Sequence, residues 1–316
     1  MDGWFVAARA AHIGACLLLV AVWAMDRMIV APSSRGASLS IDLAWGRIAR
    51  GLTVFTLPVA LLSGLVWLAM VTIGMTGLPV REALRLEVLG TVLNQTQFGM
   101  IWKIRTVFWL AACLAILPAV WAARPSVLQA VSAWMALLLC AMLAVSLAWA
   151  GHGADGGSWH LCADALHLLV SGAWPAGLLP FTLLLFKLKR APEPGRDLAV
   201  YHLARRFSIM SLTSVCLLTA TGLANSWVLV GSWHNFWHTS YGRMLGVKIA
   251  LFIPMVALGA VNMFYLKPRL TTDAASSAAA RLRWNVSAEV VLGTLVIIAV
   301  AILGLLPPGT MCDCGM

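Results

Sequence analysis

The sequence predicts an all-α membrane protein that crosses the bilayer eight times. Hydrophobic residues make up 61% of the chain, charged residues only 11%, and the mean hydropathy is +0.89, whereas soluble domains have about 25% charged residues. A helical span needs roughly 20 apolar residues, and it must be helical because backbone groups in lipid have no water to bond. Eight windows satisfy this, at about Phe5–Met25, Ile48–Met70, Phe98–Val120, Val127–Trp149, Leu161–Phe186, Phe207–Val230, Arg243–Leu266 and Val286–Leu306.

The basic residues lie in alternate loops, and this alternation predicts the orientation. Lys and Arg concentrate in residues 26–50, around Arg124, in residues 187–206 and in residues 267–283. Of the loops between them, Gly151–His160 has no Lys or Arg and the loop between the sixth and seventh windows has only Arg243 at its edge, which is the positive-inside pattern. We therefore expect both termini to be extracytoplasmic. The formal net charge of +10 follows from this topology, so no nucleic-acid partner is expected.

The first windows can be justified one by one. We interpret the first as a helix and not as a signal peptide, because Arg9 and His12 interrupt its front and no A-x-A cleavage site follows. The second contains the small pair Ser63-Gly64, which permits close helix contact. The following segment, Pro79–Asn94, places apolar residues among charges and predicts a helix lying on the membrane interface.

The second half of the chain weakly repeats the first in the same order. The matching features are His12 and His167, Arg50 and Arg206, Ser63-Gly64 and Thr221-Gly222, and Phe98-Gly99 before Arg105 with Tyr241-Gly242 before Lys248. Four helices in each half give the halves the same orientation. The sequence thus predicts two parallel four-helix repeats, residues 1–153 and residues 154–316, the second ending in a short Cys/Met tail.

The segment Gly151–Pro180 carries an unusual polar stripe. His160, Asp164, His167, Ser171 and Trp174 follow at i, i+4, i+7, i+11 and i+14, which places them along one face of a helix. Polar groups at membrane depth are costly unless they are paired, so the stripe indicates a functional site.

The predicted topology gathers six of the seven histidines on the outer side. His152, His160, His234 and His238 fall in or beside outer loops, and His12 and His167 lie about two turns inside their helices; His202 is cytoplasmic. Two interpretations of His12 and His167 stay open: metal ligands in matching positions, or core histidines hydrogen-bonded to a neighbouring helix. His234 and His238 are weaker metal candidates, because His is common at membrane interfaces.

The C-terminal tail offers soft ligands. Met311, Cys312, Cys314 and Met316 follow a Pro-Pro-Gly stop on the predicted outer side, with Met316 the weakest candidate. Thiolates and thioethers favour Cu(I), and imidazole suits copper in either oxidation state. A C-x-C pair is poorly spaced for a mutual disulfide, so chelation is one interpretation and an unstructured tail with oxidised thiols is the other.

Other chemistries have little support in the sequence. It contains no Gly-rich phosphate loop after a strand, no H-E-x-x-H and no Gly-x-Ser-x-Gly, and we expect no enzymatic activity. A haem held between His12 and His167 remains an alternative, because paired transmembrane histidines can ligate haem iron.

Three motifs carry a resemblance to a known family. D-A-L-H-L-L with a following Trp-x-x-G spans Asp164–Gly177, Y-G-R-x-L-x-x-K spans Tyr241–Lys248, and Asn262 is followed by Pro268-Arg269-Leu270. Together they resemble the copper resistance protein D (CopD) family of bacterial inner-membrane proteins. The resemblance implies an eight-helix protein linked to copper movement between periplasm and cytoplasm, often beside a periplasmic copper-binding protein of the CopC type.

These observations combine into one hypothesis, a copper transporter whose entry site faces outward. The expected path runs from His152, His160, Cys312 and Cys314, with Met311, inward to His167 and His12. Asp164 would orient His160 or His167 through a hydrogen bond, with Trp174 beside it. The alternatives are a haem-binding electron carrier and a copper-binding adaptor or sensor without transport. Direction, coupling ion, Cu(I) or Cu(II) and oligomeric state stay open.

Overall fold

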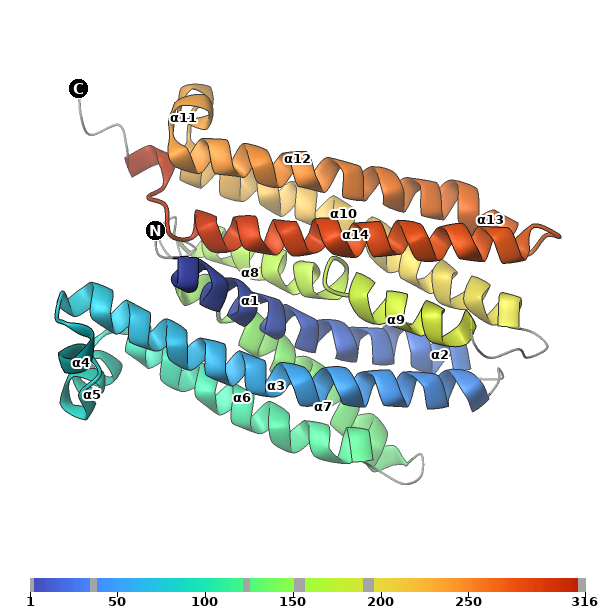
Figure 1. The fold of residues 1–316 in the computed structure, drawn as a ribbon, viewed down its shortest axis with the longest axis horizontal. Coiled ribbons are helices and arrows are strands. Elements are labelled where there is room, and N and C mark those ends of the chain that lie inside the picture. The colour runs from blue at the N-terminus through green and yellow to red at the C-terminus, as the bar shows by residue number, and fades with distance from the viewer. Residues whose placement is uncertain (1–2, 35–38, 122–125, 151–156, 190–195, 312–316) are drawn as a thin grey trace.

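The computed structural model describes residues 3–34, 39–121, 126–150, 157–189 and 196–311 and shows an all-helical bundle (Figure 1). Eight helical segments in these ranges are long and apolar enough to cross a membrane, which confirms the eight predicted windows. They are Gly3–Ser33, Ile41–Thr76, Gln97–Trp121, Val127–Ala150, Gly157–Lys189, Leu198–Val230, Ser240–Arg269 and Ala275–Leu303. The chain is therefore a multi-pass membrane protein.

The helices of the first half of the chain include one that departs from regular α geometry. α1 (Gly3–Ala24) continues through the π-helical turn η1 (Met25–Val30) into α2 (Ala31–Ser34). The other elements are α3 (Leu39–Thr76), α4 (Val80–Ala83), α5 (Leu86–Gln95), α6 (Gln97–Trp121), α7 (Val127–Val145) and η2 (Ala148–Ala150).

In the second half, the fifth span is broken into two helices. α8 (Gly157–Ala173) and α9 (Leu178–Lys189) replace the single helix expected over Leu161–Phe186. Pro175 has no N–H and its ring collides with the carbonyl four residues earlier. The Ala176 N–H instead reaches back five residues to the Ser171 carbonyl at 3.1 Å. The expected helical stripe therefore stops before Trp174, which lies in the break.

The remaining elements of the second half follow without another such break. They are α10 (Arg196–Val230), α11 (Trp233–His238), α12 (Ser240–Ala260), the π-helical turn η4 (Val261–Leu266), α13 (Lys267–Arg269), α14 (Ala275–Leu303) and η5 (Gly309–Met311). Turns of π-helix frequently occur at functional sites.

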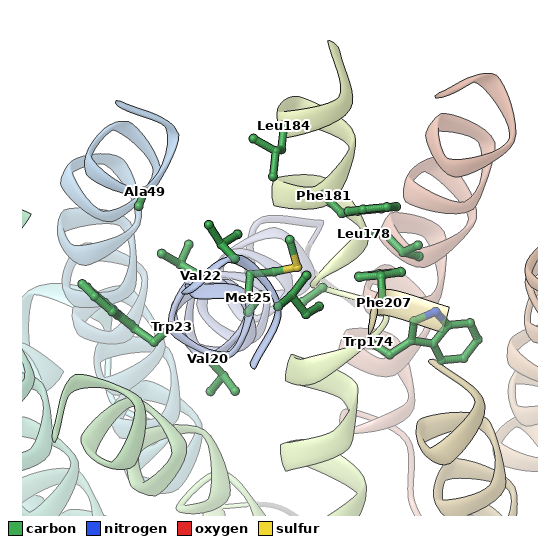
Figure 2. Packing of buried hydrophobic residues seen from close by; sticks show 14 of the residues in the cluster. Val20, Val22, Trp23, Met25, Ala49, Trp174, Leu178, Phe181, Leu184 and Phe207 are labelled. Carbon is green, nitrogen blue, oxygen red and sulfur yellow. The ribbon is translucent and has the colours of Figure 1, made fainter. Parts of the chain in front are cut away.

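α1 lies at the centre of the bundle, in contact with α3, α7, α8 and α14. Figure 2 shows Val20 and Trp23 of α1 and Met25, the first residue of η1, pointing in different directions into the surrounding helices. All three are at most 2% exposed. α1 is apolar on every side because it is surrounded by protein, as expected for a fully buried helix.

The two ends of the described chain lie at one end of the bundle, together with α4, α5 and α11 (Figure 1). Arg9 Nη1 donates to the Gly304 carbonyl at 2.9 Å, which joins the first turns of α1 to the end of α14. α13 lies at the opposite end. We refer to the first of these as the terminal end; that it faces outward stays a prediction.

A short helix packs against the start of a long one in each half, at a glycine. A Cβ on Gly99 would lie 2.3 Å from the Val92 carbonyl oxygen of α5, and a Cβ on Gly242 would lie 2.4 Å from the Asn235 carbonyl oxygen of α11. The hydroxyls of Thr96 and Thr239 accept from these two glycine N–H groups, both at 3.0 Å. The segment expected as one interface helix over Pro79–Asn94 forms the two helices α4 and α5.

Candidate functional site

The first polar cluster surrounds His12 on α1, a side chain only 3% exposed. Arg105 of α6 donates from Nη2 to His12 Nε2 at 2.6 Å. A guanidinium can only donate, so Nε2 accepts and the ring proton is on Nδ1. Nδ1 then donates to the Ala60 carbonyl of α3 at 2.9 Å, with Ser63 Oγ at 3.3 Å. Both ring nitrogens of His12 are therefore engaged.

Arg105 is itself buried and bonded to two helices, α1 and the C-terminal end of α7. Besides His12, it donates to the Leu143 carbonyl at 3.0 Å, to Ser146 Oγ at 2.6 Å and to Cys16 Sγ at 3.6 Å. The only salt bridge in the described part of the chain joins Arg27 to Asp26, so no described carboxylate pairs with Arg105. A cavity of about 10 Å³ beside His12 and Arg105 has room for a single water molecule.

The second cluster surrounds His167 on α8 and, like the first, combines a histidine with a hydroxyl and a cation from two other helices. His167 Nδ1 lies 2.9 Å from Thr221 Oγ1 of α10, and Lys248 Nζ of α12 lies 3.5 Å from Nε2. The Thr221 hydroxyl donates to the Leu217 carbonyl, so it accepts from Nδ1–H and Nε2 accepts from Lys248.

A carboxylate distinguishes this second cluster from the first. Asp164, one turn before His167, accepts from Asn225 Nδ2 at 3.0 Å and acts electrostatically on Lys248 and Tyr241. It thus places a negative charge near the cation that faces His167.

The two clusters use the residues that the internal repeat pairs with one another. His12 and His167 lie on α1 and α8, Ser63 and Thr221 on α3 and α10, and Arg105 and Lys248 on α6 and α12. The division of the chain into two repeats stays a prediction, but the paired positions have matching partners in both halves. In each cluster a cationic side chain lies against Nε2 of the histidine, and this contact was not predicted from the sequence.

His160 differs from both of these histidines. It lies in the first turn of α8, at the terminal end, with 0% of its surface exposed. Its ring is edge-on to Trp159, with ring centroids 6.0 Å apart, yet neither Nδ1 nor Nε2 has a hydrogen-bond partner among the described residues. Buried polar groups without partners are rare and costly. Within the described ranges, His160 is therefore the buried predicted ligand whose two nitrogens are both unpartnered.

The other predicted site residues are scattered or lie outside the described ranges. Trp174 is 1% exposed and edge-on to Phe252, away from the histidine clusters. His234 and His238 are exposed and stack on each other on α11, with ring centroids 4.1 Å apart. Met311 in η5 is 58% exposed. The residues outside the described ranges are His152, Cys312, Cys314 and Met316.

Within the described ranges, no three His, Cys, Asp or Glu side chains are close enough together to hold a metal ion. The expected stripe therefore supplies single ligands and not a complete site.

Both halves of the chain match known protein families. Residues 1–161 match the model described as "Copper resistance protein D-like, N-terminal domain", and residues 201–303 match "Copper resistance protein D". The chain belongs to the copper resistance protein D family. No solved structure matches the chain.

Three relatives of the copper resistance protein D family illustrate the range of similarity. Copper resistance protein D from Pseudomonas syringae pv. tomato is 32% identical over 69% of this chain and 71% of its own length. Inner membrane protein YebZ from Escherichia coli is 28% identical over 68% and 70%. Copper transport protein CutJ from Bacillus subtilis is 30% identical over 68% of this chain, but the match spans only 38% of CutJ. With its eight spanning helices, this family member is a multi-pass inner-membrane protein.

In this copper resistance protein D family member, sequence reasoning missed three polar side chains as site residues. Arg105 and Lys248 were recognised only as repeat positions, and Glu289 was not singled out. Each lies inside an apolar window, and an ionisable residue in such a window indicates a functional site. That signal alone would have found all three.

Proposed function

We propose that the protein binds copper ions at the terminal end of the bundle and moves them across the inner membrane. The observation that carries the proposal is His160, a buried imidazole with both ring nitrogens unpartnered in the first turn of α8. Imidazole binds copper in either oxidation state. Family membership supports copper as the ion, because relatives are named for copper resistance and copper transport.

The ligand set around His160 needs side chains from the terminal end. His152 is eight residues away along the chain, and Cys312 and Cys314 follow η5, which contacts α10, α11 and α12 at this end. With the tail thiols the site would favour Cu(I). A periplasmic copper-binding protein of the CopC type would deliver copper here if the terminal end faces outward.

Passage inward would follow α8. His160, Asp164 and His167 lie on one face of this helix, at i, i+4 and i+7. His167 Nε2 faces the Lys248 ammonium, so copper can reach this nitrogen only after Lys248 withdraws, with Asp164 as its nearby counter-charge. We propose that the cation on each inner histidine closes the path until copper displaces it.

A haem function is not favoured by this geometry. A bis-histidine haem needs His12 and His167 to face one iron, but each Nε2 faces the cation of its own cluster. We propose no enzymatic activity.

Metal analysis of the purified protein tests the binding part of the proposal. His160→Gln should lose most of the bound copper and keep its thermal stability, because Gln preserves polarity but ligates copper poorly. His202→Gln is the matched control, because His202 is exposed on α10. Equal copper content in both variants and the parent would refute His160 as a ligand.

A further inference from the structure

A second buried site lies in the same half of the chain as His160 and His167. A cavity of about 210 Å³ is lined by residues of α10, α14, the end of α12 with η4, the break after α8, and Phe181 of α9. Thr221, which bonds His167, lies farther along α10. Most of the lining is aromatic or aliphatic; the polar side chains in it include Ser208, Ser211, Asn262 and Glu289.

Glu289 of α14 faces this cavity with one oxygen free. The residue is 2% exposed. Its Oε2 accepts from Asn262 Nδ2 at 3.5 Å, and Asn262 Oδ1 accepts from Asn285 Nδ2 at 3.0 Å. Oε1 is buried and has no hydrogen-bond partner in the part of the chain that the structure describes. A Cβ on Gly259 would lie 3.4 Å from Oε1, so the backbone of α12 lies directly beside this oxygen.

The charge of Glu289 is not compensated by its surroundings. Among the described residues that line the cavity, Glu289 is the only ionisable one. The basic residues of the helices that form the cavity lie outside its lining, and no salt bridge in the described part of the chain joins one of them to Glu289; those with described side chains are Lys187, Lys189, Arg205, Arg206, Arg243, Lys248, Lys267, Arg269, Arg281 and Arg283. An ionised carboxylate buried without a partner is costly in a membrane. A bound cation is therefore needed when Glu289 is ionised, or a bound proton in its place.

The ligand chemistry selects a proton over a metal ion. A carboxylate and amide oxygens are hard ligands, which suit copper poorly. Calcium needs six to eight oxygens and magnesium an octahedral set, whereas Glu289 and Asn262 provide three side-chain oxygens, one of which already accepts from Asn285. A proton needs only Oε1.

We propose that Glu289 is a reversible proton-binding site and, resting on the proposed copper transport, that its protonation couples proton movement to copper movement. The proton comes from water entering the cavity, forms an O–H bond at Oε1, and returns to water when Glu289 ionises again. No electron is transferred. In the predicted repeat, the counterpart of α14 in the first half is α7, the fourth long helix of that half. α7 contains no acidic residue in Val127–Val145, so the carboxylate site belongs to the second half alone.

Carbodiimide labelling tests the proton site without any copper. Dicyclohexylcarbodiimide is apolar and reacts with protonated carboxyl groups: the acid O–H adds across one C=N bond, and the adduct rearranges to a stable N-acylurea without losing a group. We expect mass spectrometry to find this adduct on Glu289, in a yield that falls as the pH rises. Glu289→Gln should abolish the adduct, and Glu289→Asp should retain it. Glu87→Gln, which removes an exposed carboxylate of α5, should leave it unchanged. Absent or pH-independent labelling of Glu289 would overturn the proposal.

Copper uptake into proteoliposomes that enclose a pH-sensitive dye tests the coupling. We expect copper entry to change the internal pH in the parent, and Glu289→Gln to abolish this change while its copper content after purification stays normal. An equal pH response in Glu289→Gln would overturn the coupling. A parent that is labelled at Glu289 but moves no copper would refute the proposed transport and leave the proton site standing.

Discussion

Removing the charge of Lys248 should strengthen copper binding, because this ammonium occupies the position that copper would take on His167. Nζ lies 3.5 Å from Nε2. Even with the side chain withdrawn to ~4 Å from the ion, two unit positive charges repel by about 4 kcal/mol at an effective dielectric constant of 20. Asp164 offsets part of this repulsion. We therefore expect Lys248→Met to raise the affinity for Cu(I) between about tenfold and about a thousandfold, at 1.4 kcal/mol per factor of ten.

The assay is competition for Cu(I) against a chromophoric chelator, with the purified protein in detergent. Arg243→Met is the matched control, because Arg243 is an exposed cation on the same helix, α12. It should change the affinity little. An affinity that is unchanged or lower in Lys248→Met than in Arg243→Met would refute the argument that His167 takes copper against its cation.

Three further predictions follow from the fold and the tail. Gly99→Ala and Gly242→Ala should each cost about 1–3 kcal/mol of stability, because the new methyl meets backbone atoms of α5 or α11; Gly51→Ala, with nothing within 4 Å of the added atom, should show no such loss in thermal unfolding. Replacing Cys312 and Cys314 with Ser should weaken Cu(I) capture without changing the melting temperature. If this double variant captures as much Cu(I) as the parent, the tail does not bind copper. Reporter fusions after Met316 should be active outside, and fusions within residues 192–196 inside; the opposite pattern would reverse the orientation and place the His160 site in the cytoplasm.

Much of the fold can be predicted because bilayer thickness dictates helix length. The eight windows match eight spans, since only an apolar helix of this length satisfies its backbone in lipid. The order of matching residues along the two halves was also enough to pair positions between them. Ser63 lies beside His12, and Thr221 lies beside His167. The break at Pro175 was missed, because proline tolerance in a span depends on neighbouring helices.

Which side chains meet in each site was harder to predict from the sequence, because this depends on how the helices are rotated about their axes. Arg105 meets His12 across 93 positions of sequence, and Lys248 meets His167 across 81. A helical stripe shows which side chains share a face, but it does not show which cation on another helix faces them. Trp174 was expected on the stripe because the break at Pro175 was not predicted, and it instead lines the cavity of Glu289.

We propose that copper enters through His160 and crosses the membrane. The most direct measurement is time-resolved copper uptake into proteoliposomes by the parent, His160→Gln and His202→Gln, reconstituted at equal protein density. We expect the parent and His202→Gln to take up copper, and copper uptake by His160→Gln to be near that of empty liposomes. Undiminished uptake by His160→Gln, or no uptake by the parent above empty liposomes, would contradict it.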